Sequence, residues 1–591
     1  MGTDGRDRGP EARAGQPHHD EIEPGKRLVR AAPAAGAPLA QQVVRWFERL
    51  TWRTPLHDRR LDGQHPPKLL AAPVDPFPGD ELAGEALLEG WLFAAGEQRA
   101  IAELDPLAPA RPGFTDYLHG FAWLRDLAAT GERERAAAVA ETLAQRWLMA
   151  HGERPTEPAW RPDVAARRLL MLLFHAPLLL SSSNLVARSR VLTAMARGAR
   201  HLDRTADKAP PGAARVLAWG GVVAAGLLLP GGETRRSVGE DGLARALAGA
   251  LTEDGGVISR SPAQLLAVME TIGLLRALYD SRREPLPEAP AAALARATPA
   301  LLGSALGDGG LASWQGGLPL DATRINDALQ ASGAFGRPLR QSRDWGYQRL
   351  SAGGAVLLVD AAPPPAATVA DGGCAATLAL EFSDGAERLI VSCGGAGHAR
   401  ARGSDAMAQA LRTTAAHSTL VIADTNSTAL NPDGTLGRGV TAVELARQES
   451  DAGSRIEARH DGYARRFGFV HQRTLLLTAD GRELRGEDAV LPAPQPARWG
   501  RRVEGAMTPL ALRFHLGPGV DAVATADAQA AMLRTPSGAF WQLRARADRL
   551  TVEDSVWSDP HGRLVPTRQI VIDSLAPAGG ATIAWVLRRA R

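Results

Sequence analysis

Residues 343–361, RDWGYQRLSAGGAVLLVDA, mark the point at which the hydrophobic period of the chain changes. The run GGAVLLVDA is typical of a β-strand, and the segments after it alternate apolar and polar residues. Before it, apolar residues recur at every third or fourth position, as they do in amphipathic helices. The chain is therefore predicted to consist of a helical half followed by a β half, with the boundary near residue 340.

The helical period holds from about residue 38 to residue 335. PLAQQVVRWFERLTW (38–52) opens the series, and FTDYLHGFAWLRDLAATG (114–131) ends at Gly131, a natural C-terminal stop. Short joints with glycine or proline separate the segments, as antiparallel helical hairpins require. Roughly ten helices of this kind predict a toroid or a solenoid.

The second half has the spacing of antiparallel strands. ATLALEFSDGAERLIVSC (376–393) and FVHQRTLLLTADGRELRGEDAV (469–490) each contain an Asp-Gly dipeptide of the kind that closes a hairpin. Nine or more such strands bury their inner faces by forming a two-sheet sandwich. The expected organisation is a disordered tail (1–37), an incomplete (α/α) toroid (38–340) and an antiparallel β-sandwich (341–591).

Composition restricts the possible functions. The chain has 591 residues, a formal net charge of +3 and 45% hydrophobic residues, which describes a soluble multidomain protein without the concentrated basic field of a nucleic-acid binder. No signal peptide is visible and the apolar runs are too short to span a bilayer, so we expect a soluble cytoplasmic or periplasmic protein. Cys374 and Cys393 either pair across a hairpin or are two reduced, buried thiols.

Several strings resemble the heparinase II/III family of polysaccharide lyases. The resemblance runs from about residue 115 to the C-terminus and is most specific in the β half. It implies a toroid packed on a β-sandwich, an acidic polysaccharide in the cleft between them, and cleavage by β-elimination. The strings are DGGVISRSP (254–262), RDWGYQRLSAGGAVLLVDA (343–361), LALEFSDGAERLIVSCG (378–394), RTTAAHSTLVI (412–422), ARHDGYARRFGFVHQRTLLL (458–477) and RFHLGPGV (513–520).

β-Elimination needs a group that neutralises the substrate carboxylate, a Tyr or His that removes the C5 proton, and an acid that protonates the leaving oxygen. The family string DG…E-x-S-P-x-Y-H carries the catalytic tyrosine, but this chain has Ser259, Gln264 and Leu265 at the Glu, Tyr and His positions. The H-x-H string of the sandwich is also absent, and Cys393 stands where some members have a metal-binding aspartate. We therefore predict no bound metal and no other cofactor.

The remaining candidates come from both halves of the chain. His417 is the histidine that survives in the resemblance, and it is either a buried structural residue or a ligand in the cleft. Tyr463 and His460 lie in a cationic stretch that favours a lowered phenol pKa. With His417, they form the predicted catalytic set; Arg260, Arg412 and Arg459 are predicted to bind substrate carboxylates, and Trp219 and Trp123 to stack on sugars. We expect His417 and at least two of the others to share one concave surface facing the helices.

Three functions follow from these observations. The first is a heparinase II/III-like lyase acting on a uronate-containing polysaccharide. The second is a catalytically degenerate member that binds anionic glycan without cutting it. The third, a toroid glycoside hydrolase, ranks last because the sequence pairs no two carboxylates convincingly.

Overall fold

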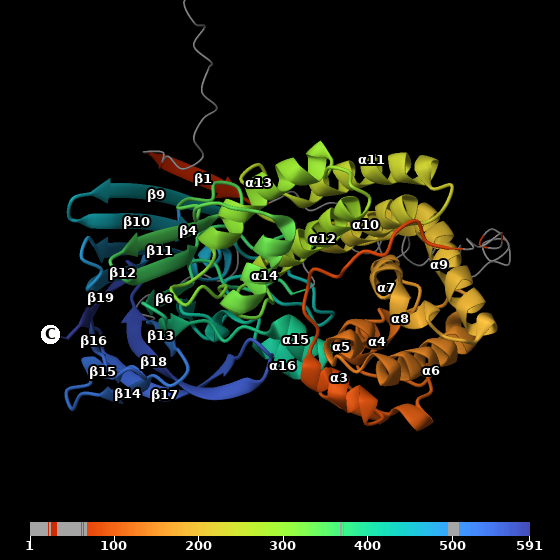
Figure 1. The fold of residues 1–591 in the computed structure, drawn as a ribbon. Helices are drawn as coiled ribbons and strands as arrows, with labels where there is room; N and C mark the ends of the chain where they lie inside the picture. The colour runs from red at the N-terminus through yellow and green to blue at the C-terminus, as the bar shows by residue number, and fades with distance from the viewer. Residues whose placement is uncertain are drawn as a thin grey trace, which may run out of the picture.

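The computed structural model describes residues 22, 25–31, 61, 63, 68–366, 369, 372–494 and 507–590. The helix predicted at 38–52 and most of the predicted tail lie outside these residues. Figure 1 shows helices gathered at one end of the molecule and two sheets at the other.

The helical half is built from successive helices whose ends carry the expected signals. Asn184 caps α9 by accepting hydrogen bonds from two backbone N–H groups, and Gly333 ends α14 in the left-handed conformation. The helices are α3 (Glu81–Leu88), α4 (Pro112–His119), α5 (Trp123–Ala129), α6 (Arg133–His151), α7 (Pro162–Phe174), α8 (Ala176–Leu180), α9 (Leu185–Thr205), α10 (Ala213–Leu228), α11 (Glu233–Ala250), α12 (Pro262–Ser281), α13 (Glu288–Gly303) and α14 (Ala322–Ser332).

One antiparallel sheet of the β half has nine strands in the described part of the chain. Its order is β1 (Lys26–Arg30), β9 (Ala442–Ser450), β10 (Gly453–His460), β11 (Phe469–Thr478), β12 (Glu483–Pro492), β19 (Ala581–Arg589), β16 (Phe540–Arg546), β15 (Ala530–Arg534) and β14 (Asp521–Ala524).

The other sheet runs β17 (Arg549–Ser558), β18 (Leu564–Ala576), β13 (Thr508–Leu516), β7 (Glu387–Val391), β6 (Leu380–Asp384), β5 (Ala355–Asp360) and β4 (Tyr347–Ala352), with β8 (Leu420–Ile422) paired to β13. Two short helices, α15 (Ala396–Ala401) and α16 (Asp405–Ala410), lie between β7 and β8 of this sheet, and a third, α17 (Ala464–Phe467), lies between β10 and β11 of the nine-stranded sheet. A separate hairpin, β2 (Trp91–Ala94) and β3 (Glu97–Ala100), lies in the helical half.

Strand β5 shows how the two halves join. Every residue in it is buried, because Leu357 and Val359 belong to the sandwich core while Val356 and Leu358 belong to the helical core. Successive side chains of a strand point to opposite faces, so this sheet is covered by the second sheet on one face and by helices on the other. The apolar residues of β5 therefore form the junction between the helical half and the sandwich.

The prediction of a disordered tail over residues 1–37 is wrong for five of its residues. Lys26–Arg30, inside the segment predicted to be disordered, forms β1 and pairs with all of Ala442–Ala446 on β9. Five residues with half-exposed side chains carry little periodic signal, whereas a free sheet edge supplies backbone partners for any extended segment. The predicted helical-then-sandwich fold is confirmed: α14 ends at Ser332 and β4 begins at Tyr347. No helix in the described ranges is long and apolar enough to cross a bilayer.

Candidate functional site

A cavity of about 2210 Å³ lies between the helical half and the sandwich. Its helical wall is formed by residues of α4, α5, α7, α10, α12 and α14, and its sandwich wall by helix α15 and by loop residues at 364–366, 369, 428–440 and 560–561. Pockets for small molecules usually measure about 300–1,000 Å³, so this cleft has room for several sugar units.

Charged side chains of α4, α5 and α7 form one part of the helical wall. Arg161 donates to Asp163 at 2.7 Å and lies 3.3 Å from Asp116, whose pKa is raised by partial desolvation although its side chain is still 47% exposed. The Tyr117 hydroxyl donates to Asp126 at 2.5 Å. Burial and the negative charge of Asp126 raise the pKa of Tyr117 well above its usual value, so this phenol stays protonated.

The first turn of α12 supplies another part of the helical wall. Proline at the start of α12 is favourable, and two positions later Gln264 is half-buried and lines the cleft. Leu265, the next residue, is fully buried. Glu270, six residues after Gln264 on the same helix, accepts two hydrogen bonds from Arg324 of α14. An amide therefore lines the cleft at the position that the sequence resemblance aligns with the tyrosine of the family string.

Hydrogen bonds fix the shape of the 428–440 loop in the sandwich wall. Asn431 and Thr435 are joined by a backbone and a side-chain hydrogen bond, and Gly434 between them has a φ of 80°, which favours glycine. The buried Arg412 guanidinium donates to the Gly434 carbonyl oxygen at 2.6 Å and fixes the loop to the sandwich. Arg438 extends this wall and is exposed.

None of the eight predicted site residues lines this cleft. The prediction that His417 and at least two of the others share one concave surface facing the helices is therefore wrong. His417 is fully buried beside β8, and neither ring nitrogen has a hydrogen-bond partner among the described residues. Burial, with the nearby His515 as a smaller cause, lowers the pKa of His417 to about 3. The imidazole is therefore neutral and part of the packed interior.

His460 and Tyr463 also belong to the sandwich interior. The Gly462 N–H donates to His460 Nδ1, which leaves the proton on Nε2 to reach His471 Nδ1 at 3.3 Å. His471 Nε2 then donates to Asp488 at 2.8 Å, which Arg473 also contacts. Every link uses the same neutral tautomer, and burial lowers the pKa of both histidines.

Tyr463 is fixed in place by the Leu420 carbonyl oxygen. Its hydroxyl donates to this oxygen at 3.0 Å, and the side chain is 1% exposed. Burial raises the pKa of Tyr463, which is the reverse of the shift that its cationic sequence neighbours predicted. The cationic neighbours do not offset this effect of burial on the pKa, because the Tyr463 ring points into the sandwich core.

The three predicted arginines have structural partners. Arg260 ion-pairs with the buried Asp360 at 2.5 Å and donates to carbonyl oxygens of Trp345 and Pro363, so it joins the helical half to β5. Arg412 is fully buried and donates to peptide oxygens. Arg459 pairs with Glu444 of β9 at 2.8 Å and is not among the residues that line the cleft.

The two predicted tryptophans are packing residues. Trp123 is fully buried, and its indole N–H donates to the Leu118 carbonyl oxygen. Trp219 is 5% exposed and donates to Asp207. Neither presents a face on which a sugar ring can stack.

Most residues that line the cleft were not predicted from the sequence. Asp116 and Tyr117 lie in the predicted helical segment 114–131, which the structure divides into α4 and α5, but the residue predicted to bind substrate there was Trp123. The stretch NPDG at 431–434 is a strong turn signal, and it marks the loop that builds the sandwich wall. Among described residues no cluster of three or more His, Cys, Asp or Glu is arranged to hold a metal ion, and both cysteines are buried free thiols.

Comparison with known proteins agrees with this architecture. Residues 335–586 match the family described as heparinase II/III-like, C-terminal. The solved structure of heparinase III superposes with a TM-score of 0.69 and 12% identity, covering 94% of this chain and 92% of that one. Heparan sulfate lyase HepC from Pedobacter heparinus gives a TM-score of 0.56 at 14% identity, covering 93% and 88%. At such identities the likeness shows a shared fold.

A curated relative extends the match over nearly the whole chain. FtsZ-localized protein C from Caulobacter vibrioides is 32% identical over 552 residues, which is 90% of this chain and 92% of the relative. Together with the matched C-terminal region and the toroid-plus-sandwich fold, this similarity shows that the chain belongs to the heparinase II/III-like family.

Proposed function

We propose that this protein binds a polysaccharide in the cleft without cleaving it by β-elimination. The observation that carries the proposal is Gln264, an amide at the cleft position where the family string has its catalytic tyrosine. An amide cannot remove the C5 proton of a uronic acid. The histidine of the same string is replaced by the buried Leu265.

Other cleft residues supply no clear replacement for the missing base. Tyr117 is the one tyrosine among the described lining residues, and its raised pKa keeps it a donor to Asp126. His561 is the one histidine there, and no described residue orients its ring by a hydrogen bond. A general base needs both an available lone pair and a fixed position.

The charges of the cleft favour a weakly charged glycan in place of the acidic polymer that the family resemblance implies. Arg125, Arg161 and Arg324 are neutralised by carboxylates of the protein. Five lining carboxylates make no ion pair with described residues, and they would repel a densely sulfated or uronate-rich chain. They are Asp80, Asp126, Asp321, Asp327 and Asp433.

Two exposed arginines can still bind individual acidic or hydroxyl groups. Arg167 on α7 and Arg438 on the 428–440 loop lie on opposite walls and make no ion pair with a described residue. Arginine offers several N–H donors in a fixed plane, which suits sugar hydroxyls and single carboxylates. We propose that they contact the glycan from both sides.

The similarity to FtsZ-localized protein C supports a second proposal, a role at the site where FtsZ assembles. The match covers nine-tenths of both chains, so the two proteins share both halves of the fold. A fluorescent fusion of the full chain, imaged with labelled FtsZ in the native cell, tests this role. Coincident mid-cell signal supports it, and a uniform signal in dividing cells rejects it.

The experiment that tests glycan binding uses a panel of neutral, amino-sugar and uronate-containing polymers. Binding is measured by calorimetry, and the same mixtures are monitored for ultraviolet absorbance of unsaturated sugars. Arg167→Ala and Arg438→Ala are compared with Arg459→Ala, which removes an arginine away from the cleft. Binding that weakens in the two cleft variants alone, without new absorbance, supports the proposal; unsaturated product would establish the lyase activity instead.

A further inference from the structure

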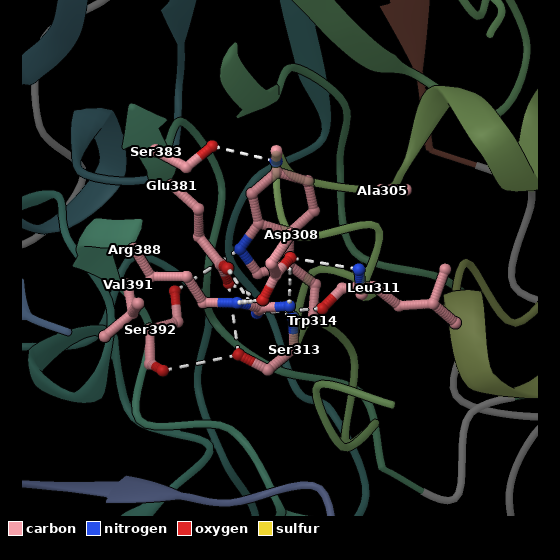
Figure 2. Close-up of polar contacts among 12 residues, drawn as sticks. Ala305, Asp308, Leu311, Ser313, Trp314, Glu381, Ser383, Arg388, Val391 and Ser392 are labelled. Carbon is pink, nitrogen blue, oxygen red and sulfur yellow. Dashed lines mark hydrogen bonds and ion pairs between the residues drawn. The ribbon is translucent and has the colours of Figure 1, made fainter. Parts of the chain in front are cut away.

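A buried carboxylate lies where the helical half meets the sandwich. Glu381 on β6 is fully buried, and the loop between α13 and α14 (304–321) covers it. Ser313 of this loop donates its backbone N–H to Glu381 Oε1 at 3.2 Å, and its hydroxyl lies 3.1 Å from the same oxygen (Figure 2). The hydroxyl is also 3.3 Å from the Ser392 carbonyl oxygen, so its single proton has two acceptors.

The second carboxyl oxygen of Glu381 is poorly compensated. Oε2 has no hydrogen-bond partner among the described residues, and Arg388 Nη1 lies 4.0 Å away. Arg388 is already engaged, because it donates to both oxygens of Asp308 at 2.7 and 3.1 Å and to the Leu311 carbonyl oxygen at 3.0 Å. A negative charge on Oε2 is therefore buried with little to balance it.

The other titratable groups around Glu381 do not supply the missing charge. Tyr347 on β4 is neutral, since burial raises its pKa well above the usual value. Asp360 at the end of β5 is paired with Arg260. Consistent with this geometry, burial raises the pKa of Glu381 from its ordinary value of 4.5 to about 7, with Arg388, Ser313 and the Ser392 backbone opposing the shift.

The loop that covers Glu381 continues into the walls of the cleft. Its Gly316 and Gly317 carbonyl oxygens accept hydrogen bonds from the N–H groups of Gly397 and Gly395 at the start of α15. Gly397 lines the cleft, as do Leu320 and Asp321 at the end of the loop. A displacement of this loop would therefore move parts of both walls.

We propose that Glu381 is a protonation-dependent latch between the two halves, which holds the 304–321 loop against β6 when neutral and loosens it when ionised. The neutral carboxyl still accepts from Ser313 and needs no counter-charge. After ionisation, a state in which water reaches Oε2 becomes more favourable, and that state requires the loop to move away. Opening therefore increases from mildly acidic to mildly alkaline pH.

Hydrogen exchange of the full chain at pH 6 and pH 8, corrected for the intrinsic rate at each pH, tests the latch. The reporters are the Leu311 and Ala312 amides, which donate within the loop. The pKa of the Glu381 carboxyl is 4.5 when hydrated and about 7 when buried. This difference makes opening of the loop about tenfold more frequent at pH 8 than at pH 6.

Glu381→Gln should abolish this pH dependence, because the amide keeps the shape and cannot ionise. Glu387→Gln, a carboxylate on the adjacent β7 that contacts Ser537 instead, should leave the tenfold change intact. Equal opening at both pH values in the unsubstituted protein, or a tenfold change that persists in Glu381→Gln, would overturn the proposal. Measurement on the unsubstituted chain keeps the test decisive even if a variant folds poorly.

Discussion

Replacing Arg260 by alanine should destabilise the protein far more than replacing Arg459, although the sequence assigned both to substrate binding. Arg260 is 6% exposed and its partner Asp360 is fully buried, so the substitution leaves a buried carboxylate with Gln315 as its main remaining side-chain donor. Removing one member of a buried pair costs about 3–5 kcal/mol. The Arg459–Glu444 pair is 41% exposed on both sides, and its loss costs about 0–1 kcal/mol.

The pH dependence of the Arg260→Ala variant gives a second check. Burial already raises the pKa of Asp360, and Arg260 is the largest cause that lowers it, so removing the arginine raises this pKa further. A carboxyl whose folded pKa exceeds its unfolded value loses stability as pH rises between the two. The deficit against the unsubstituted protein should therefore be smaller at pH 5 than at pH 8.

Urea unfolding followed by circular dichroism measures both variants. The expected result is a large drop in unfolding free energy for Arg260→Ala, a negligible one for Arg459→Ala, and unchanged glycan affinity in the folded fraction of each. A drop below about 1 kcal/mol for Arg260→Ala, well under the range for a broken buried pair, would refute this structural assignment. So would a loss of glycan binding without a loss of stability.

Four further substitutions test the roles of buried and cleft residues. His417→Leu should change the unfolding free energy by less than about 1.5 kcal/mol, because the neutral ring makes no hydrogen bond to a described residue. His515→Leu removes hydrogen bonds to Ala415 and Ser555 and should lower the unfolding free energy by about 1–3 kcal/mol. Ionisation of Glu381 should lower the unfolding free energy of the unsubstituted protein by about 3 kcal/mol as pH rises from 4.5 to 7, because its folded pKa lies above the unfolded one. Glu381→Gln should remove this loss, which is measured as the difference between the urea unfolding series of the two proteins. Arg438→Ala should weaken glycan binding about tenfold, which is the worth of one lost charged hydrogen bond, with an unchanged melting temperature; an unaffected affinity would remove this arginine from the site.

Much of the architecture could be predicted because periodicity reports which faces are buried. The change from a period near 3.6 to a period of 2 around residue 340 separated helices from strands, and the continuous apolar run at 355–360 is a strand covered on both faces. Strand β1 could not be predicted, since its pairing depends on the edge of β9, more than 400 residues away in the sequence.

The candidate site was harder to predict because burial of polar residues depends on tertiary partners. His417 and Tyr463 carry residue types suited to catalysis, yet their rings point into the sandwich core, and no sequence period distinguishes that orientation from one facing the cleft. Gln264 could be placed by the family string and does line the cleft. The wall at 428–440 is an irregular loop, and loops provide turn signals without saying what their side chains face.

The most direct test of the central claim is a single experiment on the unsubstituted protein, in which polymer binding and formation of unsaturated sugar are followed in the same reaction. We expect at least one weakly charged glycan to bind and no ultraviolet absorbance to develop, because Gln264 cannot take the C5 proton and Tyr117 remains protonated. A steady rise in absorbance with any polymer of the panel would contradict the account.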